Sequence, residues 1–159
     1  MVIMSHGVKP GNEKERVMEA RISIITLGVR DMERSYRFYH DSLGFPAVNK
    51  PEDGIVFFQT AGTRLAIYPL DSLAEDVSPG IDSERAGFPG MTLAHNTHTK
   101  DEVEIVLELA KDAGGLIVKS AQDADWGGYH GYFTDPDGYY WEVAWAAFWE
   151  FNEDGSLVV

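Results

Sequence analysis

Between residues 21 and 69 the spacing of the hydrophobic side chains changes from one kind of element to another. Isoleucine, leucine and valine are concentrated in residues 21–30, as is typical of a strand. Residues 32–43 place apolar side chains three and four positions apart, which predicts a helix, and Asp31 is suited to cap its first turn. Gly44 suits the cap at its end.

Two apolar runs follow, at residues 55–60 and 64–69, with Ala61-Gly62 between them. The glycine predicts a hairpin turn, and a short strand around residues 47–49 precedes the pair. The order predicted for the first module, residues 21–69, is therefore βαβββ. Residues 70–89 are acidic and interrupted by glycine and proline, which favours an exposed linker.

The same order of elements returns in a second module over residues 90–147. The pattern predicts a strand at 91–97, a helix through 103–110 that ends at Gly114-Gly115, and strands at 116–119, 128–134 and 139–146. Asp135-Pro136-Asp137-Gly138 predicts the tight turn between the last two strands. This repeat of order indicates duplicated modules.

We predict a single domain, because 159 residues with 44% hydrophobic content suffice for one well-filled core. Its class is α+β, with two tandem βαβββ modules forming a curved mixed sheet around a cleft. Residues 1–20 are expected to be a polar N-terminal tail. Residues 148–159 are a C-terminal tail that either forms a hairpin at Asp154-Gly155 or trails away.

Charge and cysteine content exclude several classes of partner and chemistry. Thirteen Lys and Arg against 26 Asp and Glu give a net charge of -13, which repels nucleic acids and anionic membranes. The absence of cysteine excludes disulfides, thiolate metal sites and cysteine nucleophiles. No apolar run is long enough for a signal-peptide core or a membrane span, so we expect a cytoplasmic protein.

Two segments resemble the opening and closing signatures of the vicinal-oxygen-chelate superfamily, which includes glyoxalases, bleomycin resistance proteins and extradiol dioxygenases. The first runs from Ile24 to Tyr39 and continues with Leu43-Gly44-Phe45, and the second runs from Tyr132 to Val143. The resemblance covers about residues 21–147 and implies the duplicated fold. Because the superfamily contains isomerases, lyases, dioxygenases and drug-sequestering proteins, it leaves the activity open.

In members of this superfamily that use a metal ion, four ligands come from the first and last strands of each module. The resemblance aligns these positions with Ile24, Ala66, Thr92 and Glu142, or with Met91 in place of Thr92 if the register slips by one. Of these only Glu142 is a usual ligand, whereas a divalent ion generally needs three or four protein donors. We therefore expect no metal and no other cofactor. The alternative is one divalent ion held by an unusual set of ligands.

Glu142 and His130 are the candidate acid–base residues. His130 shares strand parity with Tyr132, and histidine is the residue type most often used for acid–base chemistry, whereas Glu142 is either a ligand acceptor and general base or a structural acid. Trp126, next to two glycines, is either a stacking platform or an aromatic latch. The remaining predicted ligand-binding residues are hydrogen-bonding groups on the cleft walls: Tyr68, Thr92 and Asn96.

These observations favour a metal-independent protein that binds a small organic ligand, similar to the bleomycin-resistance branch. In that branch the modules commonly pair between chains, which implies a homodimer. The acidic charge and the aromatic residues favour a planar ligand that is neutral or cationic. A glyoxalase-like lyase or isomerase using Glu142 and His130 is the alternative, and an interaction subunit with a filled cleft is a third possibility.

Overall fold

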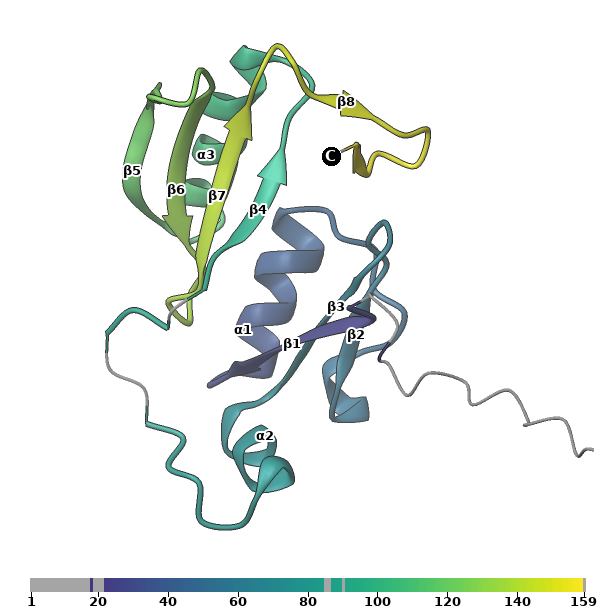
Figure 1. The fold of residues 1–159 in the computed structure, drawn as a ribbon. Helices are drawn as coiled ribbons and strands as arrows, with labels where there is room; N and C mark the ends of the chain where they lie inside the picture. Colours follow the sequence, from purple (N-terminus) through teal and green to yellow (C-terminus); the bar gives the residue numbers. More distant parts are fainter. Residues whose placement is uncertain (1–17, 19–21, 85–86, 90, 159) are drawn as a thin grey trace, which may run out of the picture.

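The computed structural model describes residues 18, 22–84, 87–89 and 91–158. The tail predicted over residues 1–20 lies outside this part of the chain, apart from Met18. Two separate sheets, each with its own helix, make up most of the molecule, and a short C-terminal hairpin projects beside them (Figure 1). None of the helices in the described part is long and apolar enough to cross a membrane.

The first module begins as the sequence predicts, with a strand that leads into a capped helix. Its elements are β1 (Ile24–Val29), α1 (Met32–Tyr36), the π-helical η1 (Arg37–Ser42), the 3-10 turn η2 (Pro51–Asp53), β2 (Val56–Phe58) and β3 (Arg64–Pro69). The side chain of Asp31 caps α1 by accepting a hydrogen bond from the backbone N–H of Arg34 at 2.9 Å. The predicted strand at 47–49 is reduced to a single bridge between Ala47 and Phe58, so that prediction is only partly right.

The second module repeats this arrangement. Its elements are β4 (Leu93–Asn96), α3 (Lys100–Asp112), β5 (Leu116–Asp123), β6 (Tyr129–Thr134) and β7 (Tyr140–Trp145). The strand orders β1-β3-β2 and β4-β7-β6-β5 correspond. In each module the first strand (β1 or β4) pairs in parallel with the last strand (β3 or β7), and the strand that precedes the last one in the sequence (β2 or β6) lies on its other side. The bridge at Ala47 takes the place that β5 takes in the second module. The α+β class and the tandem modules are confirmed.

The linker contains a helix that the sequence analysis does not predict, α2 (Leu70–Val77). This helix lies against the end of β1, where Gly28 leaves room for it: a Cβ atom at Gly28 would lie 2.6 Å from Cδ1 of Leu70 and 3.3 Å from Leu73. After β7 the chain forms the hairpin β8 (Glu150–Phe151) and β9 (Leu157–Val158), so of the two alternatives for the C-terminal residues the hairpin is right.

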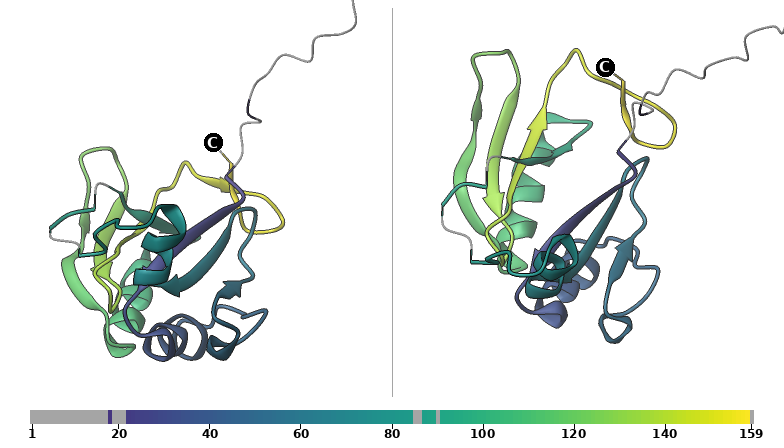
Figure 2. Two further views of the ribbon diagram at one scale, coloured as in Figure 1. Left: turned by 90° about the horizontal axis from the view of Figure 1, so that it is seen from below. Right: turned by 60° about the horizontal axis from the view of Figure 1, so that its bottom comes forward.

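The two modules share one hydrophobic core. Phe38 of η1 contacts Phe133 of β6 at 6.4 Å between ring centroids, and Tyr39 contacts Trp141 of β7 at 6.1 Å. Helix α1 accordingly lies between the two sheets (Figures 1 and 2). The helix-covered faces of both sheets therefore meet inside the molecule, and their other faces, the open faces, are turned away from this core.

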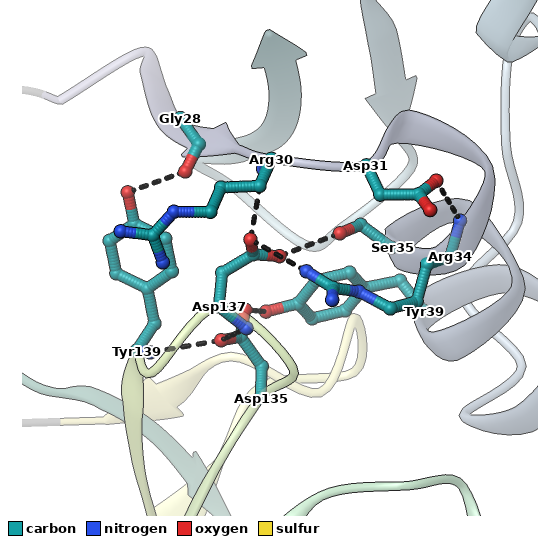
Figure 3. A network of polar contacts seen from close by, with 9 residues as sticks. All are labelled: Gly28, Arg30, Asp31, Arg34, Ser35, Tyr39, Asp135, Asp137 and Tyr139. Atoms are coloured by element: carbon teal, nitrogen blue, oxygen red, sulfur yellow. Dashed lines mark hydrogen bonds and ion pairs between the residues drawn. The ribbon is translucent and has the colours of Figure 1, made fainter. Parts of the chain in front are cut away.

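The Asp-Pro-Asp-Gly turn fastens the second module to the first through a polar network (Figure 3). The carboxylate of Asp137 accepts hydrogen bonds from the Arg30 backbone N–H at 2.9 Å, the Ser35 hydroxyl at 2.8 Å and the Arg34 guanidinium at 3.0 Å. Asp135 accepts one from the Tyr39 hydroxyl at 2.6 Å. The predicted turn is confirmed, and it also holds the two modules together.

Candidate functional site

The open face of the second sheet carries the predicted acid–base residues. Tyr132 pairs with Glu142 and His130 pairs with Ala144 across β6 and β7, so these side chains share one face. Gly131, between His130 and Tyr132, is turned to the opposite face, where a Cβ atom would lie 2.6 Å from Leu107 of α3. The strand parity expected for His130 and Tyr132 is thus confirmed.

His130 is held between a carboxylate and an ammonium group. Its Nδ1 lies 2.7 Å from Oε1 of Glu142, and its Nε2 lies 3.0 Å from Nζ of Lys119. Because a lysine ammonium only donates, Nε2 must accept, and the ring proton on Nδ1 is then donated to Glu142. With only 8% of its surface exposed and both nitrogens engaged, His130 connects the two groups that a ligand can reach.

Lys119 reaches this site because β5 is irregular. The register between β5 and β6 shifts twice, between Ile117 and Lys119 and again between Lys119 and Gln122. The first shift pairs Lys119 with Tyr132 on the open face, whereas an unbroken ladder would pair it with Gly131 on the helix side. Lys119 could not be found from the sequence, since strand parity alone does not reveal a bulge.

Aromatic rings border the polar groups. Trp126 meets His130 edge to face, with ring centroids 5.7 Å apart, and His130 meets Tyr132 at 5.6 Å. Burial raises the pKa of the Tyr132 hydroxyl, and the nearby Glu142 carboxylate raises it further because it disfavours a second negative charge. Trp126, His130, Tyr132 and Glu142 are therefore four predicted site residues that the structure brings together.

The other three predicted ligand-binding residues lie outside β6 and β7. Tyr68 is in β3, on the open face of the first sheet. Thr92 and Asn96 lie at the free edge of β4, where they line a crevice of about 970 Å³ between the modules. By strand register Thr92 and Asn96 share the face of Ala94, which pairs with Glu142. Within one chain Tyr68 does not share a pocket with Glu142, because the two open faces point in different directions.

Two polar side chains of the crevice, those of Glu102 and Thr97, serve the fold. Glu102 caps α3 by accepting hydrogen bonds from the backbone N–H groups of His98 at 2.8 Å and Thr99 at 3.0 Å. Thr97 donates its hydroxyl proton to the Thr99 carbonyl at 2.9 Å. The crevice is large enough for a small molecule, but these side chains are already engaged with backbone groups.

The strand registers support the alignment of the four metal-ligand positions. In the first module Ala66 pairs with Thr26, and Ile24 lies two residues before Thr26. In the second module Glu142 pairs with Ala94, and Thr92 lies two residues before Ala94. The side chains of Ile24 and Ala66 have no donor atoms, so this set does not fit a divalent ion. Among the described residues no three His, Asp or Glu side chains come close enough together to hold one elsewhere.

Comparison with known proteins agrees with this architecture. A glyoxalase-related enzyme from Fulvimarina pelagi is 36% identical and superposes with a TM-score of 0.80 over 88% of this chain and 98% of its own. A family enzyme from Burkholderia phytofirmans (19% identity, TM-score 0.71, 80% and 99% coverage) and lactoylglutathione lyase from Agrobacterium tumefaciens (22%, 0.61, 84% and 98%) share the fold. No curated protein matches significantly.

The family model covers most of the chain. It describes the glyoxalase/bleomycin resistance protein/dioxygenase superfamily and matches residues 21–143, which include the first module, the linker and the second module as far as Val143 in β7. The resemblance noted in the opening and closing signatures is thereby confirmed. This chain belongs to the glyoxalase/bleomycin resistance protein/dioxygenase superfamily.

Proposed function

We propose that this protein binds a small organic molecule on the open face of β6 and β7. The observation that carries the proposal is the chain of contacts from Lys119 through His130 to Glu142, at 3.0 Å and 2.7 Å. The buried imidazole fixes the orientation of both end groups, so a ligand meets a carboxylate acceptor and an ammonium donor at opposite ends of the imidazole. Such preorganised polar groups among aromatic rings are typical of small-molecule sites.

The charge of the site favours a neutral ligand. Lys119 and Glu142 compensate each other, so a ligand with both a hydrogen-bond donor and an acceptor suits them better than an ion does. The nearby rings favour a planar shape. A planar cation is the alternative, since the net charge of -13 attracts cations over a longer range.

We also propose that the protein is a homodimer. Within one chain the two open faces point apart, so a cleft walled by both faces needs the first module of a second copy opposite the second module. Pairing of modules between chains is what the resemblance to bleomycin resistance proteins implies. Light scattering after gel filtration tests this proposal, and a monomer at micromolar concentration would contradict it.

A lyase or isomerase is the second candidate. The site connects a carboxylate to a cation through an imidazole, which suits proton transfer to and from a bound substrate. Glu142 would accept the proton and His130 would keep the carboxylate oriented. The similarity to the glyoxalase-related enzyme from Fulvimarina pelagi supports this alternative. One divalent ion in an unusual set of ligands remains the alternative to a metal-free reaction.

Other partners and the cellular location stay predictions. We propose neither nucleic acid nor membrane as a partner, because the net charge of -13 opposes binding to phosphate-rich surfaces. The cytoplasmic location expected from the sequence is also a prediction.

Ligand-observed NMR with a collection of small aromatic amides, phenols and amines tests the proposed function. Binding by the wild-type chain should be lost in Glu142→Gln and Lys119→Met. It should persist in Glu153→Gln and Lys50→Met, which make the same chemical changes at exposed positions. If the wild-type chain binds no member of the collection, or if all four variants bind alike, this site is not the binding site.

A further inference from the structure

Lys119 differs from two other lysines of the described chain in the group that its side chain meets. Lys100 and Lys111 form ion pairs with carboxylates, at 3.1 Å and 2.9 Å. A carboxylate partner favours the ammonium form of a lysine, and it accordingly raises the pKa of Lys111. Lys119 meets the imidazole of His130. An unprotonated imidazole nitrogen can accept a proton from the lysine, which distinguishes Lys119 chemically.

Three side chains of the site stand in the order amine, imidazole, carboxylate. Nζ of Lys119 lies 3.0 Å from Nε2 of His130, and Nδ1 of the same ring lies 2.7 Å from Oε1 of Glu142. The same order, with a hydroxyl in place of the amine, activates the nucleophile of serine hydrolases. There the carboxylate orients the ring and stabilises its charged form, while the other ring nitrogen accepts the proton of the nucleophile. Here the group in the place of the nucleophile is an amine.

The backbone of β5 brings this amine to the ring. Lys119 lies between two register shifts, and bulges of this kind often redirect a side chain next to an active site. Its Nζ also lies 5.9 Å from the centroid of the Tyr132 ring, within reach of a cation–π attraction. The lysine is half-buried. Its amine is therefore positioned by two rings on one side while the side chain stays partly open to a small molecule.

We propose that Lys119 forms a reversible imine with a small aldehyde, and that His130 is the general base of this reaction. This inference rests on the proposed function and narrows its ligand class to neutral carbonyl compounds. A carbonyl oxygen can accept a hydrogen bond from the lysine, as the proposed function requires, and the adjacent carbon is the atom that the amine attacks.

The reaction needs no oxidant or reductant. His130 takes one proton from the Lys119 ammonium, and the amine lone pair then forms a C–N bond to the carbonyl carbon. The carbonyl oxygen receives this proton and a second one from the same nitrogen, both through His130, and leaves as water. The positive charge of the ammonium remains on the protonated imine. Glu142 keeps the ring oriented and stabilises it while it carries the proton.

Trapping with benzaldehyde and sodium cyanoborohydride tests the proposal on the full chain. The hydride reagent reduces an imine to a stable benzylamine, and peptide mass spectrometry then identifies the lysine that carries the benzyl group. Lys119 should be labelled about a hundredfold faster than the exposed Lys50, because a positioned general base contributes at least this factor. Lys100 and Lys111, which are paired with carboxylates, should be labelled no faster than Lys50.

His130→Gln separates the hydrogen bond from the proton transfer. The amide oxygen can accept a hydrogen bond from Lys119 but cannot take its proton, so labelling of Lys119 should fall to the rate of Lys50. The other lysines should keep their rates. His98→Gln makes the same change at an exposed position and should leave the labelling of Lys119 unchanged. Thermal unfolding verifies that both variants are folded.

The proposal is overturned if Lys119 of the wild-type chain is labelled no faster than Lys50, or if folded His130→Gln labels it at the wild-type rate. The first result, together with binding of the aromatic collection, would leave the proposed function intact. Preferential labelling of Lys119 in a chain that binds no member of the collection would support imine formation and remove the non-covalent binding instead.

Discussion

Asp137 and Arg34 are 103 residues apart in the chain, and their side chains meet at 3.0 Å. The two ends of this ion pair differ in environment, since the Asp137 side chain is 2% exposed and that of Arg34 is 42% exposed. Asp137 also accepts hydrogen bonds from Ser35 and from the Arg30 backbone. The turn between β6 and β7 is therefore a joint between the modules, and its carboxylates should control their association (Figure 3).

Asp137→Asn should lower the free energy of unfolding by about 1–3 kcal/mol, because one amide oxygen replaces a carboxylate that serves three donors. The loss stays moderate since Arg34 is half-exposed and can be hydrated. Urea unfolding measures it. Asp41→Asn, on an exposed position of η1, should change stability by less than about 0.5 kcal/mol. Equal effects of the two substitutions would show that the joint contributes nothing specific.

The stability of the joint should depend on pH through Asp135. Burial raises the pKa of this carboxyl above its ordinary value, even though hydrogen bonds from Tyr39 and Tyr139 act in the opposite direction. The folded chain thus holds the proton more tightly than the unfolded chain does. The stability contributed by this proton is fully present below the ordinary Asp pKa and is lost as pH rises through the raised value.

The amide side chain in Asp135→Asn does not ionise, so this variant lacks the pH-dependent contribution of the Asp135 carboxyl. The difference in unfolding free energy between wild type and Asp135→Asn should therefore fall as the pH is raised from about 4 to 7. Urea unfolding at a series of pH values measures this difference. A difference that grows with pH would mean that the ionised form of Asp135 is the one the fold prefers.

The close packing of β6 on α3 predicts a contrast between two glycines. A Cβ atom at Gly131 would lie 2.7 Å from the Lys119 carbonyl oxygen, which is backbone, so Gly131→Ala should cost about 1–3 kcal/mol. At Gly28 the nearest atom is the end of the Leu70 side chain, which can rotate away. Gly28→Ala should consequently lower the free energy of unfolding by less than Gly131→Ala does. The denaturant midpoints of the two variants measure this contrast. The reverse order would mean that α2 is packed more rigidly than β5.

Local patterns in the sequence predict the local structure well. Asp31 predicts the start of the first helix, and the turn at 135–138 forms where its residues indicate. Helix α2 was missed even though Leu70, Leu73, Ala74 and Val77 have helical spacing, because the acidic residues and the breakers after them favoured a loop. A weak amphipathic signal in a short segment is easily outweighed by composition.

Long-range contacts were beyond the sequence for physical reasons. Strand parity placed His130 and Tyr132 on one face, and the family resemblance placed Glu142 in the same cleft. The bulges of β5 that bring in Lys119 leave no mark in the hydrophobic pattern. The stacking of Trp149 on Trp126 likewise depends on the path of the chain after β7. Parity also could not show that the open faces of the two modules point apart, since that depends on how α1 packs between the sheets.

The absence of donor atoms at two of the four family positions predicts the metal content. Because Ile24 and Ala66 cannot coordinate an ion, protein purified without a metal-affinity step should contain far less than one divalent metal per chain. Elemental mass spectrometry measures this before and after incubation with Zn²⁺, Mn²⁺ or Ni²⁺ followed by gel filtration. Stoichiometric metal would contradict the prediction, and Glu142→Gln would then locate it. Loss of the metal in that variant would place an ion at the family position with an unusual set of ligands, and retention would place it elsewhere in the chain.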